Sequence, residues 1–139
     1  EWFDESVQTL INYGLVVGGY TNDLYVEKAT TVHSLMNLLK GAVERPDSAV
    51  KEQYLSKIQQ LYAEEFAKEN KNLDLNTASA IVAKLFLGED AGENNWSNLI
   101  AAGVISENTA ANIDATNHEL QTKEMFAISA DVINYLLAQ

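Results

Sequence analysis

The sequence contains no cysteine, one proline and no apolar run near the length of about 18 residues that a membrane-spanning helix requires. The absence of cysteine excludes disulfide bonds and metal sites built on thiolates. It is consistent with a cytosolic protein or with a bacterial surface protein that avoids thiols. Because no apolar run is long enough, we predict that the chain does not insert into a membrane.

Basic residues are also scarce. The chain has 9 Lys and Arg residues against 20 Asp and Glu residues, which gives a formal net charge of −11. No third of the chain is basic. Nucleic-acid phosphates and anionic lipid surfaces both attract basic proteins, so we expect neither as a partner.

The length of 139 residues and the hydrophobic content of 47% are those of one globular, largely helical domain with a buried core. The chain begins at Glu1-Trp2-Phe3, directly before a helical pattern and without a signal peptide. We therefore expect it to be a mature or excised fragment.

Apolar residues recur at helical spacing in six segments separated by glycine, proline or polar residues. This pattern predicts an all-α fold with very short extended pieces, such as Leu24–Val26 and Leu73–Leu75. The predicted helices cover 4–13, about 31–43, 48–68, the stretch from Asn76 or Thr77 to a linker at 88–95, 96–102 and about 121–137. The expected helix caps are Asp4 or Ser6, Thr30 or Thr31, Asp47 or Ser48, and Asn76 or Thr77.

The same order of elements occurs three times. Thr31, Thr77 and Thr122 are 46 and 45 residues apart (77 − 31 and 122 − 77), and each follows a short extended piece and precedes an apolar helix. Residues 7–16 also match residues 96–105 in their apolar and glycine positions. One domain of three repeats, at about 1–45, 46–90 and 91–139, explains this pattern. The alternative is an irregular helical bundle in which the similarities are chance.

The first copy resembles the S-layer homology (SLH) domains of bacterial surface proteins. Residues 14–20 and 22–25 are similar to the GIISGYPDGTFRPN-like corner of that family, and residues 29–33 stand where its ITRAE motif opens a helix. In the third copy, residues 120–125 keep the glutamate and the apolar residue after it. The resemblance implies three repeats around a pseudo-three-fold axis, on the bacterial cell surface or in the cell wall.

The resemblance also implies a non-catalytic module that anchors its parent protein by binding secondary cell wall polysaccharide in grooves between repeats. The arginine of the family motif is absent, because Thr31, Thr77 and Thr122 stand in its place. A threonine hydroxyl cannot form the paired hydrogen bonds of a guanidinium with a carboxylate. The alternative is therefore a structural or protein–protein interaction module that kept the fold and lost the glycan site.

We expect no enzyme activity, cofactor or metal, because the sequence shows no catalytic motif and no complete calcium loop. His33 and His118 are expected at the surface. Trp2 and Trp96 fit core positions, with a sugar-stacking role at a groove rim as the alternative. The candidate ligand-binding residues are Tyr20, Asn22, Asp23, Thr30, Thr31, Thr77, Trp96, Thr122 and Lys123.

Overall fold

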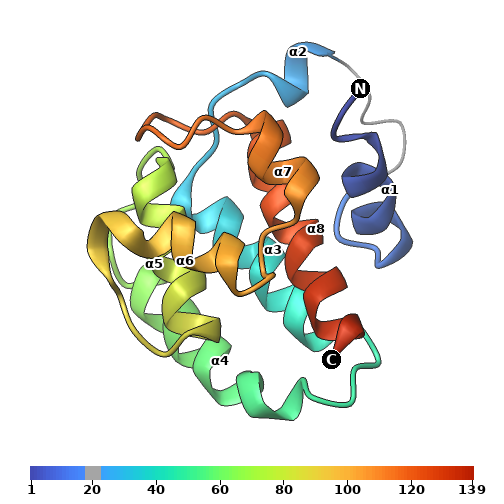
Figure 1. Cartoon of the computed structure of the whole chain (residues 1–139), viewed down its shortest axis with the longest axis vertical. Coiled ribbons are helices and arrows are strands. Elements are labelled where there is room, and N and C mark those ends of the chain that lie inside the picture. The colour runs from blue at the N-terminus through green and yellow to red at the C-terminus, as the bar shows by residue number, and fades with distance from the viewer. Residues whose placement is uncertain (18–22) are drawn as a thin grey trace.

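The computed structural model describes residues 1–17 and 23–139 and confirms an all-α fold (Figure 1). Its α-helices are α1 (Asp4–Asn12), α2 (Asp23–Val26), α3 (Val32–Glu44), α4 (Glu52–Phe66), α5 (Leu75–Phe86), α6 (Asn95–Ala101), α7 (Glu107–Asn112) and α8 (Thr122–Ala138), with a 3₁₀ turn η1 (Gly92–Asn94) before α6. Within the described ranges, no helix is long and apolar enough to cross a membrane.

The long helices pack in pairs around a common core. α4 packs on α3, α6 packs on α5, and α1 packs on α8 although these two helices lie at opposite ends of the chain. α3 also packs directly against α8. The buried faces are the apolar stripes of the sequence, and Leu35, Leu39, Ile128 and Ile133 are at most 1% exposed. Burial of these faces, rather than local propensity, therefore provides most of the stability of the fold.

Glycine ends α1 and α6 in the same way. Gly14 and Gly103 have φ angles of 69° and 79°, a left-handed conformation that glycine adopts at little cost. The amide of Gly14 donates to Ile11 and the next amide donates to Leu10, and α6 repeats both bonds at the corresponding positions. The sequence match between 7–16 and 96–105 therefore corresponds to a shared helix end.

The segments before α3, α5 and α8 join at one end of the bundle. The first amide of each helix donates to a carbonyl four residues before the start of another of these helices. The bonds are Val32 to Lys71 (3.0 Å), Leu75 to His118 (3.0 Å) and Thr122 to Lys28 (2.8 Å). Isolated antiparallel bridges join the same segments in pairs, at Thr31 with Asn72, Asp74 with Glu119, and Ala29 with Gln121. The three bonds thus close a ring, whereas a three-fold repeat of the whole chain stays a prediction.

The threonines used to align the copies occupy different places relative to their helices. Thr31 is the N-cap of α3 and accepts a hydrogen bond from the amide of Ser34. Thr122 is instead the first residue of α8, and Thr77 lies inside the first turn of α5. The predicted register of the threonines is therefore wrong, because the ring bonds relate Val32, Leu75 and Thr122.

Several local predictions are wrong. Leu24–Val26 was expected to be extended but belongs to helix α2, where Val26 is buried. The α5 cap is Asp74 rather than Asn76 or Thr77, because its carboxylate accepts from the Thr77 amide at 2.8 Å. Neither Asp4 nor Ser6 caps α1.

Ser48 was also expected to cap a helix and does not. The helix α4 begins only at Glu52, and its N-cap position is Lys51, without a side-chain hydrogen bond. The Ser48 hydroxyl donates instead to the carbonyl of Leu136 at 2.8 Å, near the end of α8. Ser48 is buried, so this long-range bond satisfies two polar groups that water does not reach.

Candidate functional site

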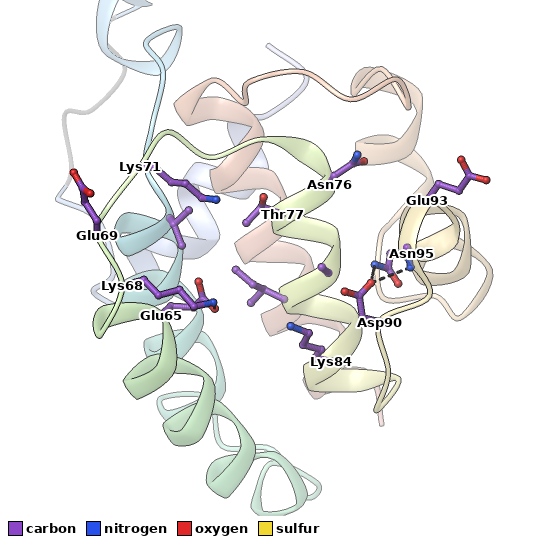
Figure 2. Close-up of a pocket in the computed structure, with 14 residues that line it drawn as sticks. Glu65, Lys68, Glu69, Lys71, Asn76, Thr77, Lys84, Asp90, Glu93 and Asn95 are labelled. Carbon is purple, nitrogen blue, oxygen red and sulfur yellow. Dashed lines mark hydrogen bonds and ion pairs between the residues drawn. The ribbon is translucent and has the colours of Figure 1, made fainter.

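A polar hollow of the described surface lies between the α4–α5 connection and α5, and we call it the lysine groove (Figure 2). Its volume is about 440 Å³. Lys68 and Lys71 come from the connection, Lys84 comes from the last turn of α5, and η1 and the start of α6 form the far wall. The polar residues that line it are Glu65, Lys68, Glu69, Lys71, Asn76, Thr77, Lys84, Asp90, Glu93 and Asn95.

The ammonium groups of the groove differ in their partners. Lys68 forms an ion pair with Glu65 at 3.0 Å, and its side chain is 67% exposed. Among the described residues, neither Lys71 nor Lys84 has a carboxylate within 4.0 Å. Figure 2 shows Lys71 extending toward α5 and Lys84 extending toward the α4 side of the groove. Two unpaired cations therefore border the same hollow.

Asp90 at the rim is attracted to Lys84, and Asp74 is attracted to Lys71, although no described carboxylate lies within 4.0 Å of either ammonium group. Asp90 accepts hydrogen bonds from the side chain of Asn95 at 2.6 Å and from the amide of Gly92 at 2.9 Å. The Asn95 bond, followed by the Gly92 bond, lowers the pKa of Asp90. Glu69 and Glu93 point away from the centre of the groove (Figure 2). The arrangement can therefore receive an anionic group of a ligand.

A second hollow of about 250 Å³ lies between the end of α1, α3 and α8, and we call it the apolar groove. Among the residues that the structure describes, its lining includes no lysine or arginine, and the polar members are Tyr25, Thr30, Ser34 and Asn37. The other residues that line it are Leu15, Val16, Val17, Leu38, Met125 and Phe126. The described lining therefore offers no positive charge to an anion.

Three of the candidate residues in the first copy lie wholly or partly outside the described residues. Tyr20 and Asn22 lie outside the described residues, and only the backbone of Asp23 is described, as the first residue of α2. Thr30 borders the apolar groove but is only 7% exposed, and its hydroxyl contacts the sulfur of Met125 at 3.5 Å. The Thr31 hydroxyl accepts from the Ser34 amide and so caps α3.

The other candidates lie apart from one another. Thr77 lines the lysine groove. Trp96 is only 7% exposed, which places its ring in the core and not at a groove rim. Thr122 is 4% exposed, and its hydroxyl donates to the carbonyl of Lys28 at 2.9 Å. Lys123 pairs with Glu27 at 3.5 Å and also lies over the ring of Phe3. Thr77 alone among these four contributes to the lysine groove.

Sequence reasoning missed Lys68, Lys71 and Lys84. The pattern at 68–72 indicates only a polar loop, and Lys84 lies on a predicted helix away from the motifs. A usable signal was present, because five of the nine basic residues fall between 46 and 90. Their convergence depends on how the α4–α5 connection returns along α5, which spacing alone does not give.

In the described part of the chain, no cluster of three or more His, Asp or Glu side chains is arranged to hold a metal ion. No family model, curated protein or solved structure matches this chain.

Proposed function

We propose that this chain is a non-catalytic surface module that attaches its parent protein to the bacterial cell envelope. Its ligand in this proposal is an anionic secondary cell wall polysaccharide, which binds in the lysine groove. The observation that carries the proposal is the pair of unpaired ammonium groups, on Lys71 and Lys84, around one hollow of a protein with a net charge of −11.

The chemistry of the groove suits acidic sugars. Ammonium groups form charge-assisted hydrogen bonds with carboxylates and phosphates, and these bonds are stronger than those between neutral groups. The Thr77 hydroxyl and the Asn76 amide line the same hollow and can bind sugar hydroxyls. Lysine replaces the arginine of the SLH motif as the source of charge, with less geometric selectivity.

The resemblance to SLH domains supports the same function. The ring of bonds at the starts of α3, α5 and α8 is consistent with three related units. The lysine groove includes α5 and the chain that follows α4, and the apolar groove includes α3, α8 and the chain that follows α1. In this interpretation the second unit carries the charged groove. The first unit carries the apolar groove.

A protein–protein interaction module is the second candidate. The apolar groove favours it, because Val17 is 73% exposed and Tyr25 is 40% exposed at its edge. Exposed apolar residues around a hollow are common at protein interaction sites. The partner in this case is another surface protein rather than a glycan.

Co-sedimentation with purified cell-wall sacculi separates the two candidates. The sacculi are tested before and after acid extraction of their secondary polysaccharide. Glycan attachment predicts binding that extraction removes and that the double variant Lys71→Gln, Lys84→Gln greatly weakens. Lys57→Gln is the matched control, because Lys57 lies on α4 outside the groove. Equal binding to both preparations, or none to either, would contradict glycan attachment.

A further inference from the structure

We propose that protonated His118 is a pH-sensitive latch, which ties the 113–121 loop to α8 and, through that loop, fixes the first turn of α5. The loop connects α7 to α8 and lies beside the segment that follows α2 (Figure 1). The latch is a local device whose existence is independent of any ligand. Its effect on binding in the lysine groove rests on the proposed function.

The geometry around the imidazole requires two donors. Nδ1 of His118 lies 2.7 Å from the carbonyl oxygen of Thr116, and Nε2 lies 3.0 Å from a carboxylate oxygen of Glu124. A carbonyl and an ionised carboxylate can only accept hydrogen bonds. A neutral imidazole has one N–H and can satisfy one of them, whereas the imidazolium satisfies both. The fold therefore selects the charged form of His118.

Glu124 connects this contact to the start of α8. One oxygen of its carboxylate accepts from the backbone amide of Gln121 at 2.8 Å, which is half of a capping box, and the other faces His118. The Glu124 side chain is only 10% exposed. Loss of the imidazolium proton would leave a nearly buried carboxylate without its charged partner, which is costly.

The charged groups around the latch favour the same protonation state. Asp114, on the loop itself, attracts the imidazolium, and Glu124 does so from α8. On the α5 side, Asp74 contacts the Asn117 side chain at 3.5 Å and is attracted to Lys71. Burial of the ring opposes its charge, but the bonds to Thr116 and Glu124 outweigh burial and raise the pKa of His118 above 6.5.

The loop holds α5 through hydrogen bonds that it accepts from two backbone amides of the first turn. The amide of Leu75 donates to the carbonyl of His118 at 3.0 Å, and the amide of Asn76 donates to the side chain of Asn117 at 2.9 Å. Asn76 and Thr77 line the lysine groove. Release of the loop would therefore loosen one wall of the groove. The latch is complete below pH 6.5 and is lost as the pH rises through the raised pKa of His118.

Titration of the imidazole nitrogens by NMR tests the protonation state. His33→Gln leaves His118 as the only histidine of the chain. We expect more than half of His118 to carry protons on both nitrogens at pH 6.5, and we expect Glu124→Gln to lower its titration midpoint. A neutral ring at pH 6.5, or a midpoint that Glu124→Gln leaves unchanged, would overturn the latch.

Hydrogen exchange tests the coupling to α5. After correction for the intrinsic pH dependence of exchange, the Leu75 and Asn76 amides should lose protection several-fold above the His118 midpoint. The Leu73 amide, which donates to the carbonyl of Thr30 at the same end of the bundle, is the control, and its protection from exchange should not change. The pH effect should be absent in His118→Gln and shifted in Glu124→Gln. Protection of Leu75 and Asn76 that stays constant across the midpoint would overturn the coupling.

Neither measurement uses a ligand. Failure of the chain to bind sacculi would therefore contradict the proposed function and leave the latch intact. If both hold, binding of sacculi should weaken above the His118 midpoint in the unmodified chain and become insensitive to this pH range in His118→Gln.

Discussion

A methyl group of Leu15 occupies the position on α3 where any residue other than glycine at position 41 would place its Cβ atom. Gly41 is buried in the middle of α3, and Leu15 follows the glycine corner that ends α1. Glycine normally weakens a helix interior. At this position its lack of a side chain lets the end of α1 pack closely on α3.

Gly41→Ala should therefore destabilise the protein. The added methyl group would displace Leu15, and overpacking of this kind typically costs about 1–3 kcal/mol. Alanine returns about 0.5–1 kcal/mol of helix stability. We expect a net loss of about 1 kcal/mol in the free energy of unfolding, measured by urea denaturation.

The double variant Leu15→Ala, Gly41→Ala supplies the control. Removal of the Leu15 methyl groups clears the space, so Gly41→Ala should stabilise the Leu15→Ala background by about 0.5–1 kcal/mol. If Gly41→Ala changed the free energy of unfolding in the same direction in both backgrounds, a direct contact between these residues would be contradicted.

Most of the fold could be predicted from local patterns. The apolar stripes located all the long helices, and the matched glycines located the ends of α1 and α6. The error at Leu24–Val26 has a physical cause, because β-propensity depends on context and Val26 is buried as part of α2. The role of Ser48 was not predictable, since its partner Leu136 lies 88 residues away in the chain.

Asp74→Ala should destabilise α5. The Asp74 carboxylate accepts from the Thr77 amide and caps the helix, and loss of such a cap costs about 0.5–2 kcal/mol. Asp74→Asn should lose much less stability, because asparagine is also a good N-cap. Equal losses in the two variants, measured by thermal unfolding, would contradict the capping role.

The charge on Asp74 also predicts that the stability of the protein depends on pH. Partial burial opposes its ionisation, but hydrogen bonds from Thr77 and Asn117 outweigh burial and lower its pKa below 3.8. The stability that this group contributes is therefore present above pH 3.8 and lost as the pH falls through its lowered pKa. Asp74→Asn should show a smaller loss of stability on acidification than the unmodified chain.

Binding in the lysine groove should depend strongly on salt. The Debye length falls from about 10 Å at 0.1 M to about 3 Å at 1 M, so a contact between ammonium groups and an anionic glycan weakens as salt rises. Lys71→Gln or Lys84→Gln should each reduce affinity for extracted polysaccharide by at least about ten-fold, because a bond to a charged group contributes about 1.5–3 kcal/mol. Lys57→Gln should bind like the unmodified chain in calorimetry. Affinity that does not change with salt would contradict an ionic contact.

The candidate site was less predictable than the fold. The motif positions indicate Thr31 and Thr122 as ligand-binding residues. In the structure the Thr31 hydroxyl caps α3, and the Thr122 hydroxyl donates to the carbonyl of Lys28. A small polar residue at a helix start is favoured for capping, and its neighbours in sequence do not distinguish this role from binding. The lysines of the groove come from two elements that meet only in the folded chain.

Asp131 should make the free energy of unfolding depend on pH in the direction opposite to that of Asp74. It is 6% exposed on α8, and its carboxylate accepts from the Ser106 amide at 2.9 Å. Burial raises the pKa of Asp131, although hydrogen bonds from Ser106 and Thr109 partly offset it. The folded state therefore binds the Asp131 proton more tightly than the unfolded state. Its contribution to stability is full below pH 3.8 and falls as the pH rises through the raised pKa.

Asp131→Asn removes this titration and keeps an oxygen that can accept from Ser106. The free energy of unfolding of the variant, relative to the unmodified chain, should therefore increase as the pH rises from below 3.8 through the raised pKa of Asp131. Urea denaturation at a series of pH values, with Asp47→Asn as an exposed control in the α3–α4 connection, measures this difference. A difference that stays constant with pH would mean that Asp131 ionises equally in the folded and unfolded states. Its burial against Ser106 would then carry no electrostatic cost.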